Sequence, residues 1–144
     1  MLLLDKTLAM LRQYIDADAA GAIGTFEADE PLLKAAKLVQ SYRLEEYRRL
    51  TILGSYVLIC LAMRKHRELT LHDNIALTRG ILDGDYLIGL YYRMMSARRE
   101  WRLIAHLAPF QKKLQGDLIR GRPERAVRAE LHDSLRTYLN QLCA

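Results

Sequence analysis

One stretch of sequence decides the fold of this chain: Ile52-Leu53-Gly54-Ser55-Tyr56-Val57-Leu58-Ile59-Cys60-Leu61-Ala62-Met63. In a helix its apolar side chains would face every direction, whereas a surface helix is apolar along one stripe only. We therefore predict a helix at the centre of the molecule, surrounded by other elements. The run is shorter than the ~20 residues that span a bilayer. It is also bracketed by Arg48, Arg49, Arg64 and Lys65, so the chain is not expected to be transmembrane.

Five further segments carry apolar residues at helical spacing on either side of this run. We expect helices over about Leu2–Ala22, Pro31–Arg49, Asn74–Arg98, Arg99–Leu118 and Glu124–Leu142. Asp29 suits the N-cap and Pro31 the first turn of the second of these helices. Pro109 should bend or split the helix that contains it. Leu, Ala, Arg and Glu are abundant and Val is scarce, which favours helix over sheet. The sequence thus predicts an all-α fold, a single-domain bundle of about six helices over residues 1–144.

The composition is that of a soluble globular protein, with 51% hydrophobic and 27% charged residues. The net charge of +5 is compatible with a nucleic acid, an anionic membrane surface or an acidic partner protein. A basic helical regulatory protein that binds nucleic acid or an acidic protein is therefore one alternative. The arginines are spread over several segments instead of forming one run, which weakens the nucleic-acid interpretation.

The cysteines and the start of the chain favour a cytoplasmic location. Cys60 and Cys143 lie far apart and show neither metal-ligand spacing nor a secretory disulfide pattern. The start, Met1-Leu2-Leu3-Leu4-Asp5, lacks the charged region and long apolar stretch of a signal peptide.

No catalytic or metal-binding constellation stands out. His66 and His72 are six residues apart, a spacing that does not put them on one helix face, and they lack accompanying carboxylates. His106 and His132 fit ordinary boundary positions of amphipathic segments. The small acidic group Glu27, Asp29 and Glu30 precedes a helix, where the macrodipole favours it without any catalysis. We predict no catalytic residue, metal ligand or cofactor in this chain.

One segment asks for an explanation: Ile81-Leu82-Asp83-Gly84-Asp85-Tyr86-Leu87-Ile88-Gly89-Leu90-Tyr91-Tyr92-Arg93-Met94-Met95. A glycine inside a helix costs about 1 kcal/mol relative to alanine. Close approach of another helix over Gly84 and Gly89 would offset that cost. Alternatively, Gly84 ends one helix and Asp85 caps the next. The spacing does not decide between these two interpretations.

This segment resembles the Leu-x-Gly-Asp-Tyr/Phe-Leu segment of trans-prenyltransferases, which condense isopentenyl diphosphate with allylic diphosphates. It is more similar still to the small subunit, component 1, of heteromeric bacterial heptaprenyl diphosphate synthases. Gly84-Asp85-Tyr86, Gly89-Leu90-Tyr91-Tyr92 and Met94-Met95-Ser96 carry the resemblance in order. It continues more weakly toward Lys112-Lys113 and back to about Tyr56. The resemblance implies a fold related to a truncated isoprenoid synthase.

The departures from the catalytic members concern the metal site. Those enzymes carry an aspartate-rich D-D-x-x-D motif shortly before the Gly-Asp segment, and its carboxylates hold magnesium ions. The corresponding place here reads Met63-Arg64-Lys65-His66-Arg67-Glu68-Leu69. Arg67 stands where an aspartate is expected, and the nearby cations would repel Mg²⁺. The nearest approach to a second such motif, Leu131-His132-Asp133, holds one acid. The resemblance therefore implies that this chain is inactive alone and that Mg²⁺ belongs to a catalytic partner.

The implied role is that of a non-catalytic accessory subunit. Such subunits bind a catalytic large subunit of polyprenyl diphosphate synthase in the cytoplasm and help to set the chain length of the prenyl tail of menaquinone. The resemblance implies that the Gly84 helix forms the partner interface or the tunnel wall, through Gly84, Asp85, Leu87, Gly89, Leu90, Tyr91, Met94 and Met95. For each large apolar residue among them, burial in the core of this chain is the alternative.

Overall fold

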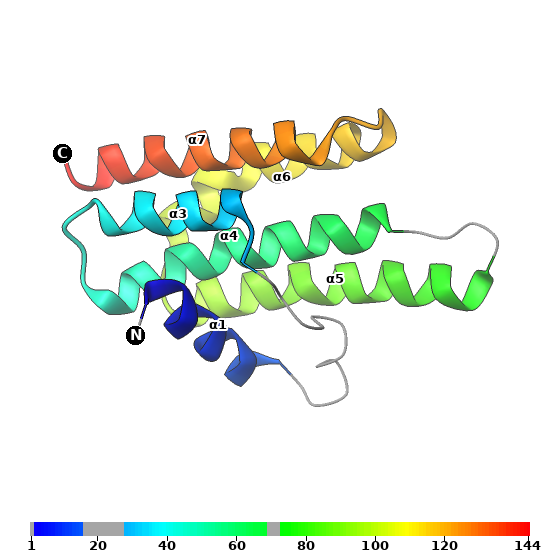
Figure 1. Cartoon of the computed structure of the whole chain (residues 1–144), viewed down its shortest axis with the longest axis horizontal. Helices are drawn as coiled ribbons and strands as arrows, with labels where there is room; N and C mark the ends of the chain where they lie inside the picture. The colour runs from blue at the N-terminus through cyan, green and yellow to red at the C-terminus, as the bar shows by residue number, and fades with distance from the viewer. Residues whose placement is uncertain (1, 16–27, 69–72) are drawn as a thin grey trace.

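The computed structural model describes residues 2–15, 28–68 and 73–144, with residues 118 and 119 described by their helical backbone alone. Within these ranges the chain forms six helices and no strand. The helices are α1 (Leu3–Tyr14), α3 (Glu30–Gln40), α4 (Glu46–Arg67), α5 (Asn74–Ala97), α6 (Trp101–Ile119) and α7 (Glu124–Leu142). The predicted all-α, single-domain bundle is confirmed (Figure 1).

Helix α4 is the centre of the bundle, as its sequence predicts. Every residue from Thr51 to Met63 is buried, and α4 contacts α1, α3, α5 and α7. Figure 1 shows α3 and the α6–α7 pair on one side of α4 and α5 along the other. The buried polar hydroxyls in this stretch are satisfied by the helix backbone, since Thr51 donates to the Tyr47 carbonyl and Ser55 to the Ile52 carbonyl. No helix in the described ranges is both long and apolar enough to cross a membrane.

Two of the helix starts are fixed by aspartate caps. The Asp29 carboxylate accepts a hydrogen bond of 3.0 Å from the Leu32 amide, and Pro31 occupies the first turn, as predicted. Asp73 accepts in the same way from the Ile75 and Ala76 amides at the start of α5. Side-chain oxygens satisfy amides that have no partner within a helix.

Two predicted boundaries were wrong. Helix α3 ends at Gln40, and Arg49 belongs to α4 instead. The chain turns at Ser41, whose hydroxyl donates to the Leu38 carbonyl, and the Arg49 guanidinium then donates to the Tyr42 carbonyl at 2.7 Å. These bonds favour a turn over a continued helix.

The other two departures concern Pro109 and the end of α1. Pro109 does not split α6, which is helical on both sides of it. Helix α1 ends at Tyr14, and residues 16–22 of the expected first helix lie outside the described residues.

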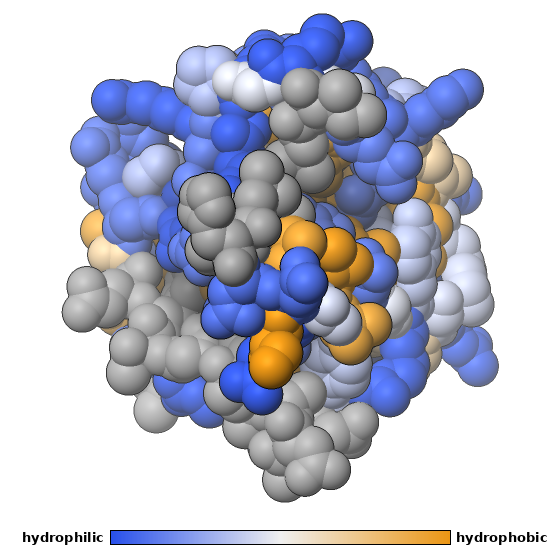
Figure 2. Space-filling model, turned by 90° about the vertical axis from the view of Figure 1, so that its right-hand side faces the viewer, coloured by the Kyte–Doolittle hydropathy of each residue, from blue (hydrophilic) through white to orange (hydrophobic). Residues whose placement is uncertain are grey.

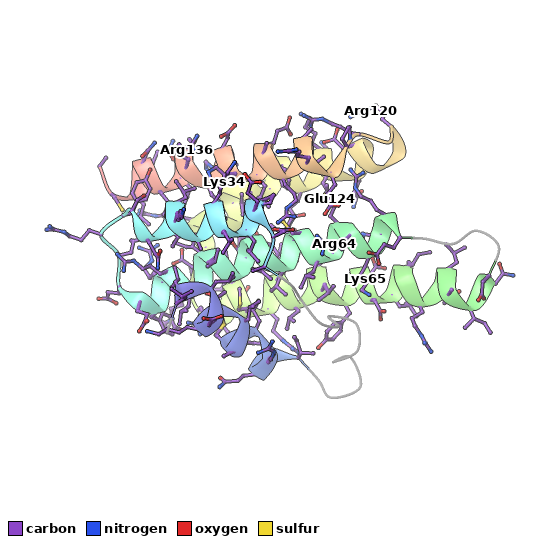
Figure 3. All side chains as sticks on the ribbon, in the orientation of Figure 1. Lys34, Arg64, Lys65, Arg120, Glu124 and Arg136 are labelled. Carbon is purple, nitrogen blue, oxygen red and sulfur yellow. The ribbon has the colours of Figure 1, made fainter. Side chains whose placement is uncertain are left out.

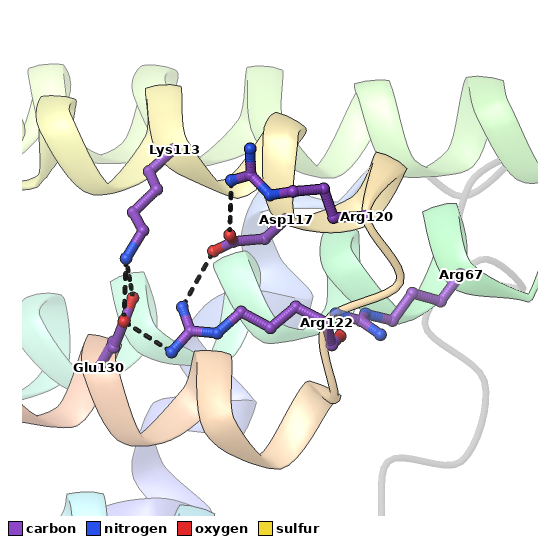
Figure 4. A network of polar contacts seen from close by, with 6 residues as sticks. All are labelled: Arg67, Lys113, Asp117, Arg120, Arg122 and Glu130. Atoms are coloured by element: carbon purple, nitrogen blue, oxygen red, sulfur yellow. Dashed lines mark hydrogen bonds and ion pairs between the residues drawn. The ribbon is translucent and has the colours of Figure 1, made fainter.

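Charged side chains connect α4 to the start of α6 and to α7 at one end of the α6–α7 pair, and α6 to α7 at the other. Glu100, which is buried, accepts hydrogen bonds from Arg48 at 2.6 and 3.0 Å and from Tyr138 at 3.2 Å. At the other end Asp117, with a side chain only 3% exposed, accepts from Arg120 and Arg122. Figure 4 shows this second network continuing from Arg122 to Glu130.

Candidate functional site

The predicted site segment lies on α5, a single helix of 24 residues that runs along α4. The helix continues through Gly84 and Asp85, so the interpretation in which Gly84 ends one helix and Asp85 caps another was wrong. Gly84 is buried against the His66 side chain of α4: a β-carbon placed there would lie 2.3 Å from His66 Nε2. Close approach therefore explains this glycine, and the neighbour is a helix of the same chain.

His66 also contacts Asp85. Its Nε2 lies 3.1 Å from Asp85 Oδ1, while the Asp85 side chain remains 65% exposed. The hydrogen bond connects the end of α4 to the middle of α5. Much of the Asp85 carboxylate therefore faces solvent, where it can accept hydrogen bonds from another molecule.

Five of the predicted interface or tunnel residues form the core of this chain instead of its surface. They are Leu87, Leu90, Tyr91, Met94 and Met95, each no more than 2% exposed. The alternative that the sequence left open, intrachain core, describes all five. Two of the predicted residues, Asp85 and Gly89, are exposed.

No contact with the described residues requires a glycine at position 89. A β-carbon built on it would meet no atom within 4 Å, in contrast to the crowded position of Gly84. A mid-helix glycine costs about 1 kcal/mol relative to alanine, and no contact in the described part of the molecule offsets that cost at Gly89. The missing side chain at Gly89 therefore leaves room for another molecule to approach the backbone of α5.

Gly89 lies within an exposed stripe that sequence reasoning missed. The stripe runs along α5 at alternating spacings of three and four residues, and we call it the outer stripe: Ile75, Thr78, Leu82, Asp85, Gly89 and Tyr92. Its large apolar members are well exposed, with Ile75 at 76%, Leu82 at 60% and Tyr92 at 42%. Figure 2 faces the end of the molecule at which α5 begins and shows apolar atoms exposed among polar ones.

The spacing of the outer stripe is that of a helix-packing seam, since residues three and four apart share one helix face. This periodicity could have been found in the sequence. The buried face of the same helix carries more large apolar residues, so its periodicity is the stronger signal in the sequence.

The end of α4, where catalytic prenyltransferases carry aspartates, is a cationic junction. Arg64 lies 3.5 Å from the Asp29 carboxylate and 3.6 Å from that of Glu124. Arg67 donates to the Arg122 carbonyl. These side chains join α4 to α3 and α7, and positive charge at a helix C-terminus is favoured by the macrodipole. The junction is thus built from structural cations, which disfavour the binding of Mg²⁺.

Three of the four histidines, His66, His106 and His132, lie within the described residues. His66 pairs with Asp85, His106 bonds to the Ser134 carbonyl at 2.8 Å, and His132 lies in a cleft between α3 and α7. His72 and Glu27 lie outside the described residues. Among the residues that are described, no three side chains of histidine, cysteine, aspartate or glutamate gather closely enough to hold a metal ion.

Comparison of the chain with protein-family models, curated proteins and solved structures finds no match. The relation to the isoprenoid synthase fold stays a prediction.

Proposed function

We propose that this chain is a non-catalytic accessory subunit of a heteromeric long-chain polyprenyl diphosphate synthase, and that it binds the catalytic large subunit through the outer stripe of α5. One observation carries the proposal: Gly89 lies on the exposed face of α5, and a β-carbon built on it would meet no atom of the described residues within 4 Å. Helices pack most closely where one presents a glycine, so a partner helix crossing at Gly89 would offset the cost of this residue.

The residues around Gly89 support an interface with a protein. Leu82 and Tyr92 flank it, each one or two turns away on the same stripe, and aromatic residues are enriched in the cores of protein interfaces. The Tyr92 ring is held in place by an edge-to-face contact with the buried Tyr91, with ring centroids 4.9 Å apart. A side chain that is ordered before binding loses less entropy when it binds.

The cationic end of α4 supports a role without catalysis by this chain alone. Arg64 and Arg67 are engaged in bonds that hold the bundle together. Replacing them with metal-binding carboxylates would remove these connections. The diphosphate chemistry and its Mg²⁺ are therefore assigned to the partner subunit, and the influence of this chain on product length acts through the interface.

The proposal requires a trans-polyprenyl diphosphate synthase subunit with intact aspartate-rich motifs in the same organism, and the test is co-expression with that subunit. The two chains should co-purify, and with Mg²⁺ the pair should incorporate radiolabelled isopentenyl diphosphate into longer products than the catalytic subunit makes alone. The purified accessory chain should incorporate none. Turnover by this chain alone, or failure of the two chains to associate, would refute the proposal.

A further inference from the structure

A cleft of about 280 Å³ lies between α3 and α7, away from α5. Tyr56 of α4 forms part of its lining, together with Lys34 of α3 and a row of basic side chains from α7: Arg125, Arg128, His132 and Arg136. Two carboxylates, those of Glu30 and Asp133, also line the cleft. Figure 3 shows Lys34 and Arg136 on the adjoining faces of these two helices. The cleft thus gathers basic groups from two helices that are distant in sequence.

The basic side chains of α7 form a row on one helix face, because they recur at spacings of three, four and four residues. Like charges at such spacing destabilise a helix when nothing compensates for them. Arg128 is compensated: it is only 5% exposed, its guanidinium forms hydrogen bonds of 2.6 and 3.0 Å with Asp29, and its Nε lies 3.3 Å from the Tyr56 hydroxyl. Arg128 is therefore neutralised by Asp29 and forms a fixed wall of the cleft, so the groups free to bind an anion are the more exposed cations around it.

The remaining cations are held loosely or have no ion pair. Lys34 pairs with Glu30 and Arg136 with Asp133, and both pairs are at least half exposed on each side. Such surface pairs contribute little stability and exchange readily for another anion. Arg125 has no ion pair with any residue of the described ranges. Three exposed basic groups, Lys34, Arg125 and Arg136, thus surround the pair of Arg128 and Asp29.

The electrostatic effect of this crowding is felt by His132. Burial lowers the pKa of His132, the nearby Arg136 and Lys34 lower it further, and Asp133 opposes them. A bound anion would therefore reduce the repulsion between protonated His132 and the neighbouring Arg136 and Lys34.

We propose that the α3–α7 cleft binds the phosphate group of a small phosphorylated molecule. Guanidinium groups bind phosphate oxygens through paired hydrogen bonds, and a lysine adds a mobile point charge. The volume of the cleft, about 280 Å³, is slightly smaller than the ~300–1,000 Å³ of ordinary small-molecule sites. This size suits a phosphate or diphosphate and not a helix or a nucleic acid strand. This proposal is independent of the α5 interface.

The experiment titrates the isolated full chain with sodium pyrophosphate, and in a second arm with sodium phosphate, while NMR follows the histidine rings. A bound anion stabilises the imidazolium form, so the pKa of His132 should rise. The ring signals of His106, which is hydrogen-bonded to the Ser134 carbonyl outside the cleft, should not move. Lys34→Ala and Arg125→Ala should each weaken pyrophosphate binding about threefold, as expected for exposed charge contacts.

The matched control is Lys37→Ala, which removes an exposed lysine from the same helix but outside the cleft. Equal weakening by Lys37→Ala, or an equal change at His132 with sodium chloride of the same ionic strength, would overturn the proposal. Vesicles containing phosphatidic acid distinguish the source of the phosphate. Vesicle binding that both cleft variants reduce assigns the cleft to a lipid headgroup, and binding of pyrophosphate without vesicle binding assigns it to a soluble ligand.

Discussion

The imidazole of His66 lies directly over the Cα of Gly84, so that a β-carbon at this position would be 2.3 Å from Nε2. The same ring forms a hydrogen bond with the Asp85 carboxylate. These contacts place the end of α4 against the middle of α5 and give Gly84 and Gly89 opposite surroundings. The two glycines therefore make a matched pair for mutation.

The first prediction uses this pair. Gly89→Ala should raise the free energy of unfolding by up to about 1 kcal/mol, because it gains helix propensity without a clash. Gly84→Ala should gain nothing or destabilise the chain, because the new methyl group displaces His66 and breaks its bond to Asp85. Urea denaturation followed by circular dichroism measures both changes.

A double mutant separates the clash from other causes. In a His66→Ala background the space above Gly84 is empty, so Gly84→Ala should then stabilise the chain about as much as Gly89→Ala does. If Gly84→Ala remains destabilising without the imidazole, the contact with His66 is not the reason for this glycine.

The second prediction concerns the buried face of α5. Leu87→Ala and Met94→Ala should each lower the stability of the isolated chain by about 2–5 kcal/mol, because both side chains are fully buried. Leu82→Ala, on the exposed face of the same helix, should change it by no more than about 0.5 kcal/mol. Thermal or urea unfolding of the chain without any partner is the measurement. If either substitution lowered the stability of the isolated chain by less than about 1 kcal/mol, the residue would not be part of its core, and the predicted interface or tunnel wall would be favoured instead.

What the sequence predicted well rests on local patterns. The uniform apolar character of Ile52–Met63 requires a central helix, and Asp29 and Pro31 act through neighbours only a few residues away. Both features therefore follow from the order of residues alone.

What the sequence left open depends on long-range packing. Asp29 and Arg128 meet across 99 positions and His66 and Asp85 across 19, and no periodicity reveals such pairs. Leu87 and Met94 would be apolar in a core and equally apolar in an interface, so their residue types could not decide between the two. Gly89 could be interpreted only when its empty surroundings were seen.

The third prediction concerns acid stability. Hydrogen bonds from Arg122 at 2.7 Å and Lys113 at 3.0 Å lower the pKa of Glu130 from 4.5 to about 2. A carboxylate whose pKa is lower in the folded chain stabilises that state above its unfolded pKa, and the contribution is lost as pH falls. For Glu130 the loss should occur between about pH 4.5 and pH 2. Glu130→Gln should flatten the dependence of unfolding free energy on pH in that window.

The control for this prediction is Glu68→Gln, at an exposed position after α4. This variant should retain the acid slope of the parent chain. Some slope should also survive in Glu130→Gln, because the pKa of Asp29 is lowered as well: burial opposes the shift, but hydrogen bonds from Arg128 and the Leu32 amide outweigh it. Identical slopes for the parent and Glu130→Gln would show that the network in Figure 4 does not contribute to acid stability.

The last prediction tests the proposed interface at Gly89. Gly89→Leu should leave the isolated chain folded and at least as stable as the parent, because a β-carbon at this position meets no atom of the described residues within 4 Å. In the complex with the catalytic subunit the same side chain would overpack a close helix contact, at a cost of ~1–3 kcal/mol, which weakens association roughly tenfold to a hundredfold.

Ala97→Leu is the matched control, because it adds a leucine at an exposed position of α5 outside the outer stripe. Each variant is co-purified with the catalytic subunit, its dissociation constant is measured, and the prenyl products are sized. Loss of association with Gly89→Leu but not with Ala97→Leu locates the interface on the outer stripe. If both variants bind as tightly as the parent and give products of unchanged length, the open space before Gly89 is not a contact with this partner, and the proposed function loses the observation that carries it.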